Sequence, residues 1–194
     1  MSTWTRRAWL RGLSASLLAV GARDLLAHVG AGPVDQPLPT LDAWVLDQNG
    51  RRRRLREMLQ GNVVALQTMF TGCSSICPLQ GALFAEVQQG LPRVQRRRPA
   101  RLLSLSIDPL GDSPDALGKW LQRMGAGPSW QAVVPTAGLE QIRTTLGGRE
   151  PDPNPDRHST QVYFINQQAQ LCWRSTMLPS TEEVLRILDA LSRA

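Results

Sequence analysis

The hydrophobic residues of this chain occur in short continuous runs and in helical repeats that follow one another. Residues 62–70 are rich in Val, Leu and Met without polar alternation, which predicts a strand buried on both faces. Residues 101–107 predict a further strand. Residues 78–89 and 181–192 instead carry apolar side chains every three or four positions, the spacing of a helix that covers a core.

Shorter segments complete the predicted order of elements. Strands are expected at 43–47, 130–134, 161–165 and 171–174, and helical segments at 55–60, 113–124 and 137–146. Ser113 and Pro114 have the residue types of a helix cap and a first helical position. Strands and helices that alternate in this way predict an α/β fold, with a central mixed sheet flanked by helices.

The N-terminal segment has the layout of an export signal. Arg6 and Arg7 stand in a Thr-Arg-Arg-Ala-Trp-Leu order that resembles a bacterial twin-arginine signal. The apolar run that follows, about ten residues long, is too short to span a bilayer comfortably, and residues 29–31 (Val-Gly-Ala) offer a cleavage site. We therefore predict a signal over residues 1–31, a proline-containing tether over 32–40 and one domain over 41–194. An ordinary amphipathic helix is the alternative for the first segment.

Arginine dominates the charge of the chain. There are 22 Lys and Arg residues against 16 Asp and Glu residues, and Lys119 is the only lysine. Residues 1–31 contain four of the basic residues and one of the acidic ones, so removing them lowers the net charge from +6 to +3. The clusters at 51–54 and 96–98 lack interleaved aromatic residues and DNA-binding motif spacing, so we interpret both as solvated loops and expect no nucleic-acid partner.

Two cysteines carry the candidate chemistry. Cys73 and Cys77 are four residues apart, between the buried strand at 62–70 and the helix that follows. The N–H groups and partial positive charge of a helix N-terminus favour the thiolate, the form that attacks disulfides and binds soft metals. A fixed disulfide, or a pair of buried structural cysteines, is the other interpretation. We expect Cys172, in a hairpin strand, to take no part in the site.

Three motifs, in order, resemble the SCO/SenC family of thioredoxin-fold copper chaperones. They are Phe-Thr-Gly-Cys-Ser-Ser-Ile-Cys-Pro at 70–78, Leu-Ser-Ile-Asp-Pro at 105–109 with Asp-Ser-Pro at 112–114, and Asp-Arg-His-Ser at 156–159 before a strand. The resemblance covers residues 40–192. It implies a thioredoxin-like sheet with a hairpin insertion, and a copper ion bound by Cys73, Cys77 and His158. It also implies that Asp108 lies near the metal.

The residue types agree with such a site. His158 is the only histidine after residue 31, so only the folded chain can bring it to the cysteines. Two thiolates and an imidazole suit Cu(I) and can accept Cu(II), whereas zinc normally takes a fourth ligand. Asp108, at the end of a strand, is expected to hydrogen-bond a metal ligand or to hold the following turn. The family usually has an acidic residue between the cysteines, where this chain has Ser-Ser-Ile.

The resemblance implies a periplasmic chaperone that delivers copper for the assembly of a respiratory oxidase, toward the copper centre of cytochrome c oxidase. Its partner would be a copper-accepting oxidase subunit or another periplasmic copper protein. Membrane contact would come only through that partner or an uncleaved signal. The alternative is a thiol-disulfide reductase that keeps acceptor cysteines reduced, in which Cys73 attacks and Cys77 resolves the mixed disulfide. The metallochaperone is the favoured of the two.

Overall fold

The structure of the protein is a computed structural model that describes residues 30–38, 42–93, 98–147 and 159–193. The predicted export signal therefore lies outside the described residues, apart from its last two positions, and so does His158. None of the described helices is long and apolar enough to cross a membrane.

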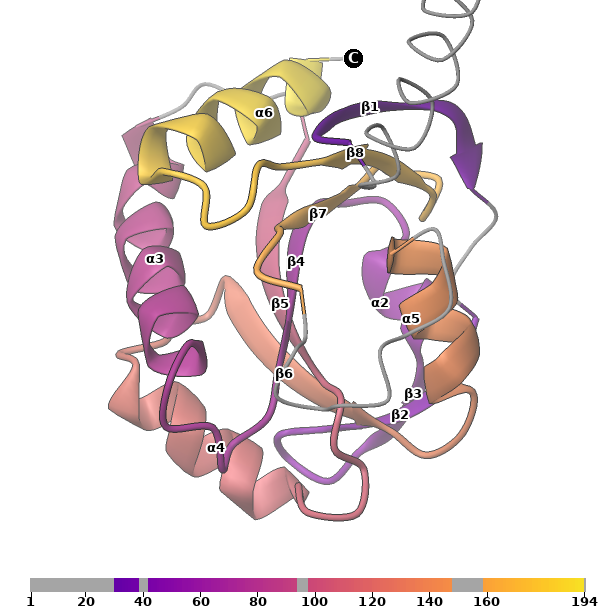
Figure 1. Ribbon diagram of the computed structural model, residues 1–194, viewed down its shortest axis with the longest axis vertical. Coiled ribbons are helices and arrows are strands. Elements are labelled where there is room, and N and C mark those ends of the chain that lie inside the picture. The colour runs from indigo at the N-terminus through magenta and orange to yellow at the C-terminus, as the bar shows by residue number, and fades with distance from the viewer. Residues whose placement is uncertain (1–29, 39–41, 94–97, 148–158, 194) are drawn as a thin grey trace, which may run out of the picture. The chain divides into compact units, whose positions relative to one another are not determined.

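A mixed sheet of eight strands forms the centre of the fold (Figure 1). Its order is β1-β8-β7-β4-β5-β6-β2-β3, with β4, β5 and β6 parallel and every other neighbouring pair antiparallel. The strands are β1 (Gly32–Leu38), β2 (Trp44–Asp47), β3 (Arg52–Arg54), β4 (Val63–Met69), β5 (Ala100–Ser106), β6 (Trp130–Pro135), β7 (Tyr163–Ile165) and β8 (Leu171–Arg174). The predicted central mixed sheet and the β7–β8 hairpin are confirmed.

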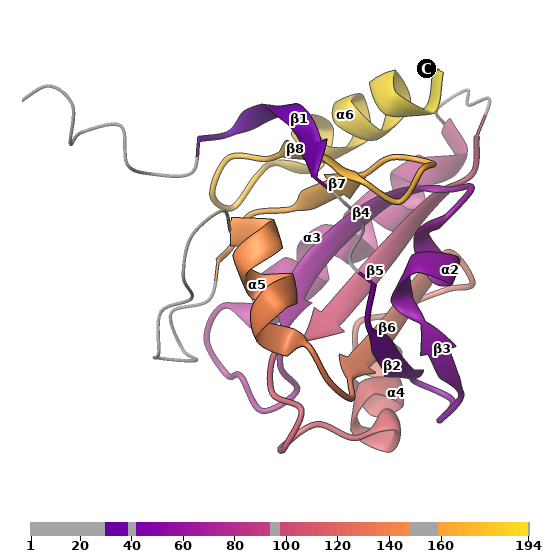
Figure 2. The same ribbon diagram turned by 90° about the vertical axis from the view of Figure 1, so that its right-hand side faces the viewer.

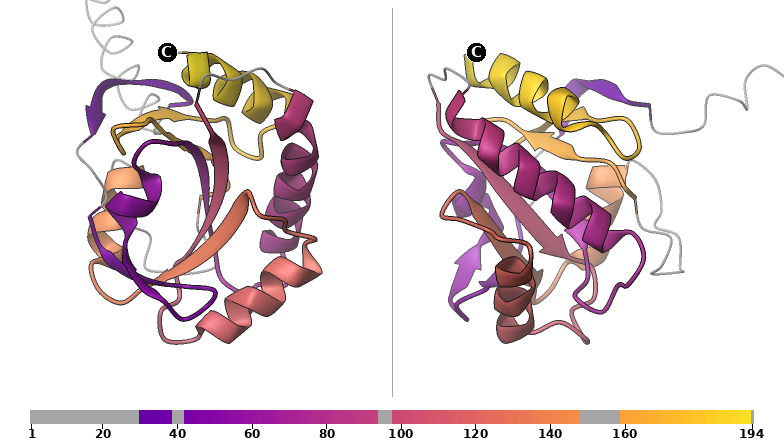
Figure 3. Two further views of the ribbon diagram at one scale, coloured as in Figure 1. Left: turned by 180° about the vertical axis from the view of Figure 1, so that it is seen from behind. Right: turned by 90° about the vertical axis from the view of Figure 1, so that its left-hand side faces the viewer.

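Helices cover both faces of this sheet. They are α2 (Leu55–Leu59), α3 (Cys77–Gly90), the short 3-10 helix η2 (Leu91–Arg93), α4 (Pro114–Arg123), α5 (Leu139–Gly147) and α6 (Thr181–Arg193). Helices α3, α4 and α6 pack on one face, as the right panel of Figure 3 shows, and α2 and α5 lie on the other (Figures 1 and 2).

Strand β4 lies between the two hydrophobic cores. All seven of its residues are buried, as the unbroken apolar run predicts. Val63, Ala65 and Met69 belong to the core beneath α3, α4 and α6, while Val64 and Leu66 belong to the core beneath α2 and α5. A strand covered on both faces is held rigidly, so the loop that leaves its carboxyl end starts from a defined position.

Aromatic packing holds α3 and α4 against the sheet. The ring of Trp130, on β6, makes edge contacts with Phe84 of α3 and Trp120 of α4, each at a centroid distance of 5.6 Å. The indole N–H of Trp130 donates to Ser104 Oγ at 2.9 Å, and Gln67 Nε2 donates to the same oxygen at 3.0 Å. These contacts anchor α3, whose first residue is Cys77.

Helix α4 begins as the sequence predicts, with a serine cap and a proline at the first helical position. Ser113 Oγ accepts a hydrogen bond from the backbone N–H of Ala116 at 3.2 Å. We expect Ser113→Ala to lower the free energy of unfolding by about 1 kcal/mol, because that N–H loses its partner. Urea denaturation measures the difference, and an unchanged midpoint with an unchanged slope would contradict the capping role.

The structure corrects the tether predicted for residues 32–40. Most of that segment, Gly32–Leu38, forms β1 and pairs antiparallel with β8, with a register shift between Pro33 and Leu38. Without β1, strand β8 would expose a row of unpaired N–H and C=O groups at the sheet edge. Prolines are tolerated in an edge strand, and for this reason a proline-rich composition did not reveal the pairing.

The first arginine cluster is also corrected, because residues 52–54 form a strand and not a loop. Strand β3 continues the hairpin from β2 and ends the sheet. The guanidinium carbons of Arg52 and Arg54 lie 4.3 and 4.9 Å from the ring centroid of Trp44, which are cation–π distances. Charged side chains on an edge strand discourage pairing with other chains. The second cluster, at 96–98, lies largely outside the described residues.

Candidate metal centre

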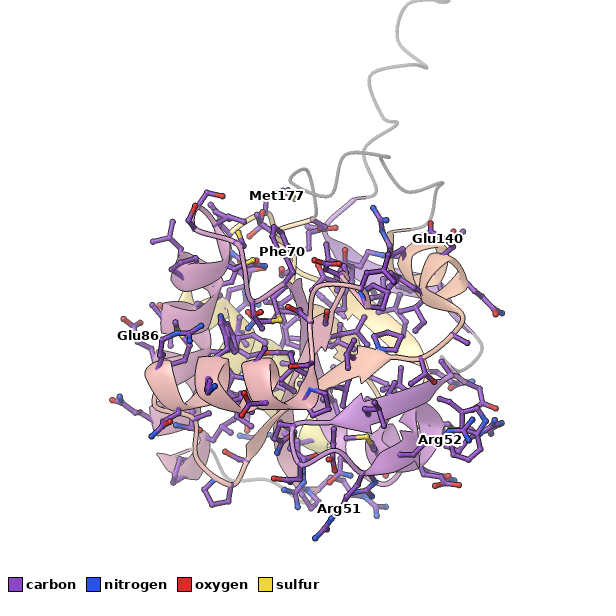
Figure 4. All side chains as sticks on the ribbon, turned by 90° about the horizontal axis from the view of Figure 1, so that it is seen from below. Arg51, Arg52, Phe70, Glu86, Glu140 and Met177 are labelled. Atoms are coloured by element: carbon purple, nitrogen blue, oxygen red, sulfur yellow. The ribbon has the colours of Figure 1, made fainter. Side chains whose placement is uncertain are left out.

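The two cysteines lie on and beside the loop that joins β4 to α3. Cys77 is the first residue of α3, whereas Cys73 lies in the loop, with its backbone N–H donating to the carbonyl of Phe70 at 3.2 Å. Figure 4 shows Phe70 on this loop, well away from Arg51 and Arg52, which point outward on the β2–β3 side. The expected position between a buried strand and a helix is confirmed for both cysteines, although only Cys77 is helical.

Cys73 is the more acidic thiol of the pair. Its sulfur accepts a hydrogen bond from the backbone N–H of Cys77 at 3.4 Å and lies 3.6 Å from Ser75 Oγ. Partial burial raises the pKa of Cys73, but the hydrogen bonds from Cys77 and Ser75 together outweigh it and lower the pKa from 9.0 to about 6. Cys73 is therefore mainly a thiolate at neutral pH.

Cys77 has the opposite environment. Its side chain is 0% exposed and belongs to the same core as Met69 and Phe84. Burial raises the pKa of Cys77 from 9.0 to about 12, and the nearby negative charges of Cys73 and Asp112 add to the shift. At neutral pH a thiolate in the loop therefore lies beside a protonated, buried thiol at the start of α3, and no disulfide joins the two sulfurs.

Asp112 supports the cysteine loop from the segment that follows the neighbouring strand β5. Its Oδ1 accepts hydrogen bonds from the backbone N–H and the hydroxyl of Thr71, at 3.0 and 2.6 Å, and its Oδ2 accepts from Ser106 Oγ at 2.6 Å. Asp112 as a whole is 8% exposed. Asp112 was not among the predicted site residues. The sequence feature that could have identified it is an acidic residue four positions after Asp108, in the segment that follows β5, the strand parallel to β4.

Asp108 holds the turn that carries Asp112. Its Oδ1 accepts a hydrogen bond from the backbone N–H of Gly111 at 2.9 Å, and its carbonyl accepts from the N–H of Asp112 at 2.9 Å. A Cβ atom at position 111 would overlap the Asp108 carboxylate, so a larger residue there would displace this carboxylate from its hydrogen bond. Turn formation is one of the two roles expected for Asp108. No hydrogen bond among the described residues joins its carboxylate to either cysteine, so a role beside a metal stays a prediction.

His158 lies outside the described residues, but its neighbour Ser159 does not. The carbonyl of Ser159 accepts a hydrogen bond from Thr68 Oγ1, at 3.3 Å, near the carboxyl end of β4. Strand β4 leads directly into the cysteine loop, so residue 159 returns to the end of the strand from which the cysteines extend. This position agrees with the predicted approach of His158 to the cysteines, which stays a prediction.

Cys172 is separate from the pair. It lies on β8, and β7 stands between that strand and β4. Its Sγ donates to the carbonyl of Phe164 at 3.3 Å, and burial raises its pKa to about 11. Cys172 is therefore a protonated thiol partly buried at the edge of the core, as expected of a residue without a part in the site.

The arrangement can bind a soft metal or form a disulfide. Cys73 and Cys77 supply two adjacent sulfur donors, the ligand type that Cu(I) prefers. Across the ranges that the structure describes, no three His, Cys, Asp or Glu side chains gather to hold a metal ion. His158, the predicted third ligand, lies outside those ranges.

Solved structures similar to this one define the class of fold. A SCO1/SenC family lipoprotein from Bacillus anthracis str. Ames matches with a TM-score of 0.67 and 23% identity, over 83% of this chain and 98% of that one. Bradyrhizobium japonicum ScoI with copper bound matches at 0.60 and 18%, over 83% and 98%. Yeast Sco1 with copper bound matches at 0.62 and 16%, over 79% and 91%. The chain therefore has the thioredoxin-like fold of these proteins.

The sequence comparison identifies the family. The SCO1/SenC family model matches residues 39–193. The chain belongs to the SCO1/SenC family. The SCO1 protein homolog of Bacillus subtilis (strain 168) is 27% identical over 112 residues, which cover 57% of this chain and 55% of that protein. The match thus spans about half the length of this curated relative.

Proposed function

We propose that this protein binds copper through Cys73, Cys77 and His158 and delivers it to a copper-accepting subunit of a respiratory oxidase in the periplasm. The observation that carries the proposal is the pair of unequal thiols at the end of β4 in a member of the SCO1/SenC family. Three solved relatives, from Bradyrhizobium japonicum, Arabidopsis thaliana and yeast, are described with copper bound. A further relative, BsSco, is described as a member of the Sco family of cytochrome c oxidase assembly proteins.

The unequal thiols define an order of copper binding. Cys73 is already a thiolate and takes Cu(I) first. Cys77 then exchanges its proton for the metal, the proton is released to solvent, and His158 completes a three-coordinate site. On delivery, thiolates of the acceptor replace the ligands one at a time, with the imidazole leaving first as the weaker ligand for Cu(I).

Copper stoichiometry of the reduced protein tests the proposal. We expect one copper per chain in the wild type, none retained by Cys73→Ser or Cys77→Ser, and an affinity reduced by about tenfold or more in His158→Ala, because one of three ligands is lost. Cys172→Ser is the matched control and is expected to bind like the wild type. Wild-type affinity in His158→Ala would contradict the three-ligand site.

A thiol-disulfide reductase is the second candidate, favoured by the accessible thiolate beside a buried thiol. The Cys73 thiolate would attack an acceptor disulfide to form a mixed disulfide. Cys77, losing its proton, would then attack Cys73 Sγ and release the acceptor as a dithiol. Two electrons pass to the acceptor and a Cys73–Cys77 disulfide remains.

The two candidates separate experimentally. Reduction of an acceptor peptide disulfide is expected to survive His158→Ala, whereas tight copper retention is not. Cys77→Ser should trap the mixed disulfide if the reductase reaction occurs, and mass spectrometry detects the trapped adduct. A His158→Ala protein that keeps copper but loses reduction would argue against both assignments of His158.

Export through residues 1–31 is part of the proposal. The twin-arginine pair and the short apolar run support it. N-terminal sequencing of protein recovered from the periplasmic fraction is expected to start after residue 31, and a sequence that starts at Met1 or Ser2 would contradict cleavage.

A further inference from the structure

Gln80 is a buried polar residue whose amide group has no hydrogen-bond partner. Its side chain is 1% exposed, and neither Nε2 nor Oε1 is paired. Among the described residues, Gln80 Nε2 is the only buried side-chain donor left unpaired. Burying an unpaired amide costs free energy, and such groups are rare in folded proteins. A free donor in this position therefore calls for a functional explanation.

The place of Gln80 in the helix points to Cys77. The two residues are three positions apart near the start of α3, and residues at this spacing share one face of a helix. Long side chains in helices point back toward the N-terminus, which for Gln80 is the direction of Cys77. Both side chains are among the buried residues of α3, so Cys77 and Gln80 lie on the buried face of the helix, near its beginning.

The neighbouring packing fixes the helix and leaves the amide as the movable part. A Cβ atom at Gly81 would overlap the side chain of Met124 and would press on Trp120, so α3 lies in close contact with the end of α4 at this level. The terminal torsion of glutamine, by contrast, has a broad energy well. The Gln80 amide can therefore turn toward a new partner without a shift of the helix.

Metal binding creates the need for such a donor. When copper replaces the proton of Cys77, negative charge develops on a sulfur that water does not reach. The backbone of Phe70 supplies one hydrogen bond to this side chain. A buried donor beside this sulfur would stabilise the charge further, because hydrogen bonds to charged groups are the stronger kind.

We propose that Gln80 Nε2 donates a hydrogen bond to the Cys77 sulfur in the copper-bound state, and that Gln80 is a positioning residue of the metal site. The inference rests on the proposed function, because copper binding is the step that charges Cys77. Gln67 offers a matched comparison on the same side of the sheet. It is also fully buried and has an unpaired Oε1, but its Nε2 is already bonded to Ser104.

Leucine variants of the two glutamines test the proposal. For Gln80→Leu we expect the dissociation constant for Cu(I), measured by competition with a chromophoric chelator, to rise about tenfold or more. The sulfur-to-Cu(II) charge-transfer absorption should move to longer wavelength, because a sulfur without its donor gives up an electron more easily. The melting temperature of the reduced, copper-free protein should stay the same or rise, because an unpaired buried amide has been removed. Gln67→Leu is expected to keep the wild-type affinity and absorption.

The outcomes separate this inference from the proposed function. Wild-type affinity and absorption in Gln80→Leu overturn the inference alone, as does an equal loss of affinity in both leucine variants. A wild-type protein that binds no copper overturns the proposed function and the inference together. If Gln80→Leu does not fold, Gln80→Ala replaces it, with a loss of affinity expected and an unchanged affinity overturning the inference.

Discussion

Iodoacetamide, added at pH 7 to the reduced and metal-free protein, is expected to modify Cys73 at least about a hundred times faster than Cys77. With pKa values of about 6 and about 12, Cys73 is mainly thiolate at this pH and Cys77 almost wholly thiol. A thiolate of lower pKa is intrinsically less nucleophilic, which offsets part of the difference. The burial of Cys77 acts in the same direction as its high pKa, because the reagent cannot reach it.

The pH dependence gives the sharper measurement. Because the thiolate forms as pH rises through the pKa, the alkylation rate of Cys73 should increase with pH, reach half its maximum near pH 6 and level off above it. Mass spectrometry of the cysteine peptides between pH 4.5 and 9 follows each residue separately. Ser75→Ala removes one hydrogen bond to Cys73 and should move the midpoint to higher pH. Equal rates for the two cysteines, or a Cys73 midpoint near the ordinary thiol value, would contradict the assigned environments.

The consequence for function is a fixed order of events. Under either proposed function, Cys73 would be the residue that meets an incoming copper ion or an acceptor disulfide, and Cys77 would respond second. The order is the same for the chaperone and for the reductase. Alkylation therefore tests the geometry of the pair independently of which activity the protein performs.

Replacing Asp112 with alanine is expected to lower the free energy of unfolding by about 3 to 5 kcal/mol. The Asp112 carboxylate accepts hydrogen bonds from the N–H and hydroxyl of Thr71 and from the hydroxyl of Ser106. In the alanine variant these three donors, which are buried or partly buried, all lose their charged acceptor. A buried donor without a partner costs about 1 to 3 kcal/mol, so the total exceeds the effect of removing a single surface charge.

Urea denaturation of the reduced protein measures this loss. Asp115→Ala is the control, because Asp115 pairs with Lys119 in an exposed i,i+4 ion pair, which contributes no more than about 0.5 kcal/mol. A comparable effect of the two substitutions would contradict the bracing role of Asp112. Because Thr71 lies two residues before Cys73, we also expect the alkylation rate of Cys73 in the Asp112→Ala protein to differ from that of the wild type.

Several elements could be predicted from local sequence because their signals are local. The unbroken apolar run of β4, the serine and proline at the start of α4 and the apolar repeat of α6 each contain the physical cause of the element within a few residues. The cysteine pair was also visible, since two thiols between a buried strand and a helix need no distant residue to be noticed.

The segments that were predicted wrongly depend instead on partners that are distant in the sequence. Strand β1 depends on pairing with β8, and the arginines of β3 depend on pairing with β2 and on stacking against Trp44. Neither composition nor charge distinguishes such a segment from a loop, because the hydrogen-bond partner lies elsewhere in the chain. Asp112 was missed for the same reason, as its partner Thr71 extends from a different strand.

By itself the sequence determined that two thiols stand four residues apart at a strand-to-helix junction in a mixed α/β domain. Only the tertiary structure decided that the thiols are unequal. The packing of α3 against β6 and α4 removes Cys77 from water, whereas Cys73 stays in the loop and receives hydrogen bonds from Cys77 and Ser75. Spacing is a property of neighbouring residues, but burial and charge stabilisation depend on segments that meet only when the chain has folded. The same packing buries Gln80 on the face of α3 that carries Cys77, where its amide has no hydrogen-bond partner among the described residues.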